Sequence, residues 1–160
     1  MLTATLNHIL IMTRNEILKE VKKFFNIEEL VCDHIVAKWG EAAWQFLDTD
    51  LLHCLLIVRR DIVQKPIYVN SKSAHQRGLR CNRCDLVKSK NTVYLSSHIL
   101  GKAVDMTVPA IPDAEKVREL IRKNANLLPC NIRLEKDVSW IHMDVLPQSG
   151  VNAKIYEFNG

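Results

Sequence analysis

No stretch of this 160-residue sequence approaches the run of about 20 apolar residues that a membrane-spanning helix needs. The opening segment, MLTATLNHILIM, lacks the basic start and the small-residue cleavage site of a secretory signal. Internal repeats and low-complexity tracts are also missing. We therefore expect no membrane insertion and no export by such a signal, and we expect residues 1–12 to form a disordered leader.

Aromatic residues are few, at 6% of the chain, and Trp39, Trp44 and Phe46 lie among apolar neighbours. That setting predicts core side chains and not a platform on which nucleic-acid bases stack. The net charge of +4 suits attraction to a polyanion such as a bacterial cell wall, but an ordinary solvated surface is the simpler interpretation. We therefore expect no nucleic-acid partner.

Cysteine is not arranged for a disulfide framework, because the chain has five cysteines, an odd number. Cys32 and Cys54 lie in apolar, helix-like segments, where a free thiol packs as a small hydrophobic side chain. His34 and His53 lie in the same segments and are predicted to be buried core histidines. We expect a reduced chain.

The length and the ordinary composition, with 48% hydrophobic and 25% charged residues, indicate one domain, which we place at residues 13–160. Helical patterns precede Pro66, and strand patterns with one further helix follow it. This order predicts an α+β fold in which N-terminal helices pack on a small antiparallel sheet.

Three helices are expected in the first half. The motif TRNE at residues 13–16 is a capping box and begins a helix over 14–25. The others are expected over 27–39, ended by Gly40, and over 51–63, capped by Thr49 or Asp50.

Short strands are expected in the second half. They cover residues 67–70, 103–109, a hairpin of 130–135 with 139–145, and 154–158. Asp113 is predicted to cap a helix over 114–127. Residues 71–95 are polar and predict a long loop, which in a compact domain is usually functional or disordered.

Two residues that can bind a metal lie in the segment SSHILGKAVD, residues 96–105. If the chain turns after His98 and enters a strand before Asp105, both side chains reach one ion. Gly101 permits the turn, and Ala103 leaves room beside the ion. His142, in the strand-like segment WIHMD, becomes a third ligand if the two strands lie side by side. Three protein ligands with one open position are typical of a catalytic zinc site.

The pattern S-x-H-x-x-G-x-A-x-D from Ser96 to Asp105, followed by aromatic-x-His-x-Asp around His142, resembles the zinc D-Ala-D-Ala carboxypeptidases and related phage endolysin peptidases. The hedgehog signalling domain shares the fold of that family. The resemblance covers roughly residues 64–146. It implies that His98, Asp105 and His142 bind one Zn²⁺ per chain, and that the substrate is a peptidoglycan stem peptide with D-amino acids.

The resemblance also implies a carboxylate that takes a proton from the attacking water. Many relatives carry this acid three residues before the last histidine, where this sequence has Ser139. Glu135 is our first candidate for the catalytic base, because hairpin pairing carries it back beside His142. Asp137, in the expected turn, is the second. Asp144 shares strand parity with His142 and is expected to orient an imidazole.

The carboxylates of such a substrate call for a guanidinium, which binds them through two parallel hydrogen bonds. Family members carry an arginine ahead of the first metal motif, and here Arg77, Arg80 and Arg83 stand in that segment. Arg77 and Arg80 are the predicted substrate-binding arginines, with solvated loop arginines as the alternative. Ser96, which opens the metal motif, is a further candidate for substrate binding.

Cys81 and Cys84 form a single Cys-x-x-Cys pair, which is typical of redox chemistry or of half a structural zinc site. No second pair stands at finger-like spacing, and only Cys130 and His75 offer isolated partners. The preferred interpretation is a pair of loop or core thiols. Replacing Cys81 is therefore expected to leave the zinc in place.

Two classes of function remain open. The first is a zinc peptidase that acts on peptidoglycan as a D,D-carboxypeptidase or an endopeptidase. The second is a non-catalytic wall-binding or structural module that keeps the fold. We expect a monomer whose substrate lies outside the cytoplasm, reached by release in phage lysis or by carriage with a virion.

Overall fold

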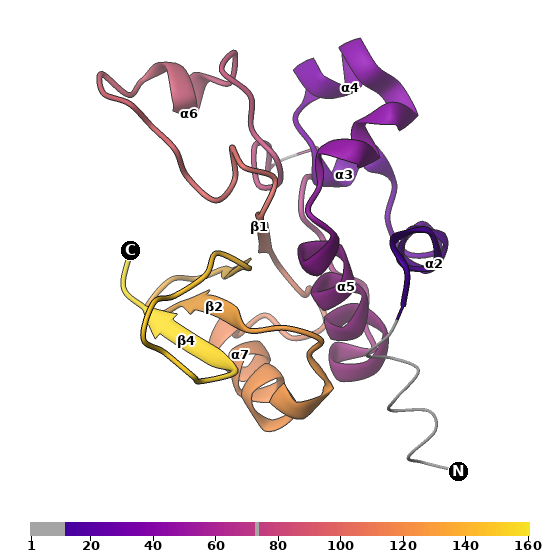
Figure 1. The fold of residues 1–160 in the computed structure, drawn as a ribbon, viewed down its shortest axis with the longest axis vertical. Helices are drawn as coiled ribbons and strands as arrows, with labels where there is room; N and C mark the ends of the chain where they lie inside the picture. The colour runs from indigo at the N-terminus through magenta and orange to yellow at the C-terminus, as the bar shows by residue number, and fades with distance from the viewer. Residues whose placement is uncertain (1–11, 73) are drawn as a thin grey trace.

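A computed structural model describes residues 12–72 and 74–160, so the predicted leader falls almost wholly outside the described part. Six helices and a four-stranded mixed sheet form the described fold (Figure 1). The first half contains α2 (Arg14–Val21), α3 (Ile27–Leu30), α4 (Asp33–Trp39), the 3-10 helix η1 (Gly40–Phe46), α5 (Thr49–Ile57) and the π-helix η2 (Val58–Val63). The second half contains α6 (Asp85–Lys88), β1 (Ala103–Met106), α7 (Ala114–Lys123), the 3-10 turn η3 (Ala125–Leu127), β2 (Ile132–Glu135), β3 (Ile141–Asp144) and β4 (Ile155–Phe158).

Helix α5 lies at the centre of the apolar core, because its side chains are buried on every face. Leu51, Leu52, Leu55 and Ile57 are each at most 1% exposed. A helix that is apolar all round is stable only inside a protein. Helix α2 packs against α5. Helix α7 packs against η2, which continues α5 (Figure 1). In the described residues no helix has the length and apolarity that crossing a membrane requires.

The helix caps follow the sequence only in part. The predicted capping box of Thr13 with Glu16 is confirmed, as are Gly40 at the end of α4 and Asp113 at the start of α7. The predicted cap of α5 is wrong. Asp48, and neither Thr49 nor Asp50, accepts hydrogen bonds from the amides of residues 50 and 51.

The predicted helix over 27–39 is broken at Val31. This residue is extended and forms a parallel β-bridge with Leu79, which lies in the long loop. The amide of Leu79 donates to the carbonyl of Leu30, and the amide of Cys32 donates to the carbonyl of Leu79, each at 2.9 Å. Tertiary pairing therefore replaces two helical hydrogen bonds and divides the segment into α3 and α4.

The sheet has the order β1-β3-β2-β4. The expected pairing of β2 with β3 is present, and β1 joins β3 antiparallel. The prediction of a wholly antiparallel sheet is wrong, because β4 pairs parallel with β2. β3 ends opposite the start of β2, and β4 begins beside that same start, so residues 145–154 cross to the other side of β2 at one end of the sheet. The fold thus combines helices with strands, and its sheet contains both antiparallel and parallel strand pairs.

Three shorter predictions also need correction. Residues 67–70 form no strand: Tyr68 makes one antiparallel bridge with Thr107, and Asn70 instead donates to the carbonyl of Val31 at 2.9 Å. The loop over 71–95 contains the short helix α6, and α7 ends at Lys123.

The aromatic residues of η1 and its neighbour divide between core and surface. Trp44 is buried as predicted, at 4% exposure. Trp39 and Phe46 are not core residues, since they are 43% and 37% exposed and contact each other edge to face at 5.1 Å. The edge contact covers part of each ring at the surface.

Gly101 bears the tight turn between the two predicted metal ligands. Its φ is +67°, and a Cβ there would lie 2.1 Å from the carbonyl oxygen of Phe46. Gly150 has a similar φ of +73°, but a Cβ added there would have no atom within 4 Å. We predict that Gly150→Ala lowers the free energy of unfolding by about 1–2 kcal/mol, the cost of a left-handed backbone.

Gly101→Ala should lower that free energy by a further 1–3 kcal/mol or so, because backbone atoms must move to admit the methyl group. Urea unfolding followed by circular dichroism measures both variants. Equal losses in the two would contradict the close approach at Gly101.

Candidate metal centre

Three side chains from three segments converge at one end of the sheet. His98 lies in the turn before β1, Asp105 in β1 and His142 in β3. The antiparallel register pairs Asp105 directly with His142. The ligand atoms of the three residues all lie within 4.8 Å of one another. The structure therefore brings together the three metal ligands predicted from the sequence.

His98 is held in the tautomer that a metal ligand needs. Its Nδ1 donates to the carbonyl oxygen of Gly78 at 2.9 Å, and this carbonyl can only accept. Nδ1 therefore carries a proton, and Nε2, the nitrogen left for a metal ion, lies 3.3 Å from Asp105 Oδ2. Metal-binding histidines commonly have their second nitrogen engaged in this way.

His142 is held between two carboxylates. Its Nε2 donates to Asp144 Oδ2 at 2.8 Å, and its Nδ1 donates to Asp105 Oδ1 at 2.7 Å. Asp144, which is completely buried, thus orients the imidazole as the strand parity predicted. The remaining nitrogen, Nδ1, points at the carboxylate it would share with a metal ion.

Arg133 fixes Asp144 in turn, and sequence reasoning did not identify it. Its Nε and Nη2 donate to the two oxygens of Asp144 at 2.7 and 2.9 Å. The signal was present in the hairpin, because Arg133 lies opposite Asp144 in the register of β2 and β3. A bidentate guanidinium of this kind holds a buried carboxylate in one orientation.

Burial and charge act in opposite directions on these groups. Burial alone would raise the pKa of Asp105, but hydrogen bonds from His142 and His98 hold it well below the usual range. Burial would lower the pKa of His142, but Asp105 and Asp144 raise it to about 9. Without metal, His142 is therefore protonated at neutral pH and lies as a cation between two anions. A metal ion would replace the proton on Nδ1.

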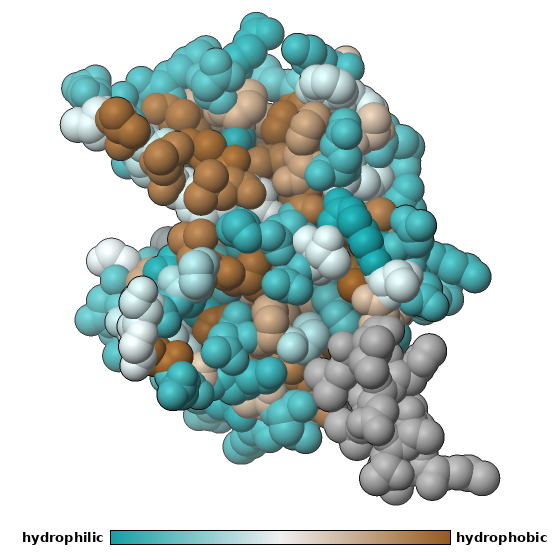
Figure 2. Space-filling view, viewed as in Figure 1, coloured by the Kyte–Doolittle hydropathy of each residue, from teal (hydrophilic) through white to brown (hydrophobic). Residues whose placement is uncertain are grey.

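The three ligands line a cavity of about 370 Å³. Figure 2 shows the molecule hollowed between the part that contains α6 and the part that contains the sheet. The loop contributes Tyr94, Leu95, Ser96 and Ser97 to the lining, and the sheet and its flanks contribute Arg133, Glu135, Trp140, Leu146 and Phe158.

The other predicted site residues divide between this cavity and the surroundings. Arg80, Ser96 and Glu135 line it. Arg77 does not: its main-chain carbonyl accepts from the amide of Asp105 at 2.8 Å, so it supports β1 by its backbone. Asp137 does not line the cavity either, and its φ of +60° places it in the turn between β2 and β3.

Arg80 is buried beside the metal ligands. Its Nη2 donates to Asp105 Oδ2 at 3.1 Å, and its Nε donates to the carbonyl of Gln76. Two anchored donors leave the Nη1 group of the guanidinium for a ligand in the cavity. The site therefore combines three side chains that could hold a metal ion, the cation of Arg80 and the carboxylate of Glu135 around one space.

A second group that could hold a metal lies outside this cavity and consists of Cys32, His34, Cys81 and Cys84.

Comparison with protein-family models, curated proteins and solved structures finds no match to this chain. The inference of function therefore rests on the side chains of the site.

Metal uptake by His98, Asp105 and His142 should strengthen as the pH rises. Because the metal-free pKa of His142 is about 9, zinc must displace a proton at neutral pH. We expect the affinity to rise roughly tenfold per pH unit from about pH 7 and to level off above about pH 9. In the metal-free protein, the ion pairs of protonated His142 with Asp105 and Asp144 stabilise the fold. This contribution is fully present below the ordinary histidine pKa of 6.5 and is lost as the pH rises through about 9.

Competition titration with a chromogenic chelator measures this affinity. The difference between wild type and His98→Ala isolates the site, since the variant keeps every other metal-binding group. Asp144→Asn should move the levelling point to lower pH, because one of the carboxylates that raise the pKa is gone. An affinity independent of pH would contradict the protonated state of His142.

Proposed function

We propose that this protein is a zinc-dependent peptidase that hydrolyses peptidoglycan stem peptides at bonds involving D-amino acids. The observation that carries the proposal is the convergence of His98 Nε2 and His142 Nδ1 on the carboxylate of Asp105 in a cavity. A purely structural His–Asp cluster has no need of a cavity that also contains a second carboxylate and a guanidinium.

The donor set suits zinc. Two imidazoles and one carboxylate are typical catalytic zinc ligands, and they leave a coordination position open. When bound, the ion would polarise a peptide carbonyl and lower the pKa of a water molecule. The nitrogen that would not bind the metal is already hydrogen-bonded in each ring, Nδ1 in His98 and Nε2 in His142. These hydrogen bonds can therefore stay in place when a metal ion binds.

Glu135 is the residue placed to move the proton. The antiparallel register that pairs Arg133 with Asp144 places Glu135 opposite His142 when it is continued by two residues. Glu135 is half-buried and lines the same cavity. A carboxylate in this position can accept a proton from the attacking water and then donate it to the leaving amine.

Arg80 is the residue placed to bind the negative end of the substrate. A stem peptide carries carboxylates, and a guanidinium binds them with directional, charge-assisted hydrogen bonds. A cavity of about 370 Å³ lies within the size range of ligand pockets. Ser96, on the loop side of the same cavity, adds a hydroxyl for the peptide backbone.

Digestion of purified muropeptides tests the reaction directly. The zinc-loaded protein should release D-alanine if it is a D,D-carboxypeptidase, or separate cross-linked stems if it is an endopeptidase. Mass spectrometry of the products identifies the bond. Intact muropeptides after treatment with zinc-loaded protein would reject the peptidase, and binding to intact sacculi would then identify a wall-binding module.

Glu135→Gln should keep the fold and the zinc but lose about 10²–10⁴-fold in kcat, the usual contribution of a general base. Asp137→Asn is the matched control, because it removes a carboxylate in the adjacent turn and asparagine tolerates a positive φ. It should act like wild type. Full activity in Glu135→Gln would exclude this residue as the base.

Arg80→Lys should lower kcat/KM by tenfold or more, about 1.4 kcal/mol, since an ammonium cannot make the same set of directional contacts. Arg77→Lys should change it little, because Arg77 does not line the cavity. Steady-state kinetics on one stem peptide compares the two. Unchanged kcat/KM in Arg80→Lys would show that a positive charge alone is enough and would contradict the directional contact of the guanidinium.

A further inference from the structure

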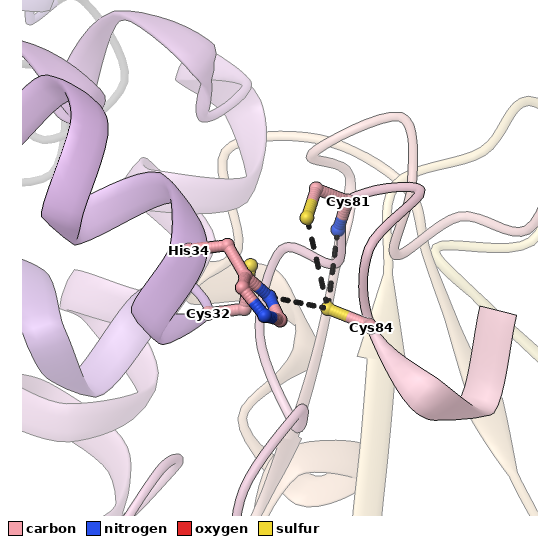
Figure 3. A group of neighbouring side chains, drawn as sticks. All are labelled: Cys32, His34, Cys81 and Cys84. Carbon is pink, nitrogen blue, oxygen red and sulfur yellow. Dashed lines mark hydrogen bonds between the residues drawn. The ribbon is translucent and has the colours of Figure 1, made fainter. Parts of the chain in front are cut away.

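Cys32, His34, Cys81 and Cys84 form the second cluster, which we call the cysteine cluster. Cys32 caps α4 and His34 lies in its first turn, whereas Cys81 and Cys84 lie in the turn before α6. Figure 3 shows the four side chains pointing toward one another from these two segments. Their ligand atoms all lie within 4.8 Å of one another.

The spacing is close to that of tetrahedral zinc. Bonds of about 2.3 Å to sulfur and 2.0–2.1 Å to nitrogen place two sulfurs about 3.8 Å apart, and a sulfur about 3.6 Å from a nitrogen. The sulfurs of Cys81 and Cys84 are 4.0 Å apart, and Cys84 Sγ is 4.0 Å from His34 Nδ1. Small side-chain movements would therefore complete the coordination.

Two backbone amides point at the sulfurs. The amide of Cys81 donates to Cys84 Sγ, and the amide of Arg83 donates to Cys81 Sγ, each at 3.4 Å. With a metal ion bound, these two amides would stabilise the negative charge on the sulfurs. Thiolate is the form of cysteine that binds a metal.

Simple packing accounts for only part of the cluster. Cys32 and Cys84 are buried, as free thiols in a core often are. His34, however, is exposed, so the prediction that it is a core histidine is wrong. Its imidazole turns toward Cys84 although solvent is open to it. A cavity of about 250 Å³ lined by Cys32, His34 and Cys84 gives an ion access to the cluster.

We propose that the cysteine cluster is a second zinc site with a structural role. Its four protein ligands, three sulfurs and one nitrogen, fill a tetrahedral shell and leave no position for substrate. The site is independent of the proposed peptidase activity. It replaces the sequence-based expectation that Cys81 can be changed without loss of zinc.

The cluster fastens the long loop to the helical half. In residues 71–72 and 74–95 the short helix α6 is the only helix or strand, and a segment of that kind has little regular hydrogen bonding to order it. The β-bridge of Val31 with Leu79 and the close approach at Gly78, where a Cβ would lie 2.0 Å from the carbonyl oxygen of Leu30, mark the same junction.

The junction leads directly into the first metal centre. Gly78 presents the carbonyl that sets the tautomer of His98, and Arg80 lies next to Cys81 in the chain. The amide of Arg80 donates to the carbonyl of His98 at 3.3 Å. A metal ion in the cysteine cluster would therefore hold the segment that orients His98 and presents Arg80.

Metal content of the purified protein tests the proposal. Plasma mass spectrometry should find two zinc ions per chain in wild type, one for each group of ligands. His98→Ala and Cys84→Ser should each retain one, and the double variant none. Cys130→Ser is the matched control, since its thiol contacts Cys54 and lies outside the cluster; it should retain two.

Cobalt substitution identifies the ligands. Cobalt-loaded His98→Ala should show intense thiolate-to-cobalt charge-transfer absorption, which disappears when Cys84→Ser is added. The single variant His98→Ala leaves the cluster intact, so the test holds even if Cys84→Ser fails to fold. Absence of that absorption in His98→Ala, or wild-type zinc content in a folded Cys84→Ser, would overturn the site.

The two proposals fail separately. A protein that shows the cobalt–thiolate absorption but cleaves no muropeptide has the structural zinc site and lacks the peptidase activity. A protein that cleaves muropeptides without that absorption is a peptidase whose cysteines bind no metal.

Discussion

The buried carboxylate of Asp105 is the group on which the metal centre depends. It accepts from His142 at 2.7 Å and from Arg80 at 3.1 Å, and it lies 3.3 Å from His98 Nε2. A carboxylate removed from water costs several kcal/mol unless it is paired. The partners that satisfy Asp105 are the two histidines that could bind a metal ion with it and an arginine that lines the same cavity. The interaction that stabilises the fold here also assembles the site.

The charges around this carboxylate are arranged in layers. Asp144 accepts a hydrogen bond from His142 on the side of the ring away from Asp105, and Arg133 donates to Asp144 in turn. The two aspartates keep their negative charge, because hydrogen bonds and neighbouring cations lower the pKa of each against the effect of burial. Such a centre would attract a divalent cation, and the bound cation would make the cavity favourable for the anionic peptide that we propose as substrate. In that proposal, metal and substrate binding are electrostatically linked.

The cysteine cluster and the metal centre share one strip of backbone, residues 78–81. Its amides and carbonyls bond to α3 and α4 on one side and to His98 on the other. Gly78 allows the close approach, because any side chain there would collide with the carbonyl of Leu30. The long loop is thus anchored at residues 78–81, while its far end, Tyr94 and Leu95, lines the cavity together with Ser96. A fixed anchor beside a less regular wall is a common arrangement at binding sites.

The sequence alone determined the features that local geometry controls. The turn at Gly101, the strand that bears Asp105 and the alternation of His142 with Asp144 follow from short patterns. The grouping of His98, Asp105 and His142 and the orienting role of Asp144 could therefore be predicted. The hairpin register, also local, placed Glu135 on the side of the cavity. Only the tertiary structure decided the rest. It placed Arg80, and not Arg77, in the lining of the cavity. It also set β4 parallel to β2 and brought Cys32 and His34 next to Cys81 and Cys84. The meeting of Cys32 and His34 with Cys81 and Cys84 depends on the bridge between Val31 and Leu79. That bridge joins segments far apart in the chain, and no spacing pattern within either segment encodes it.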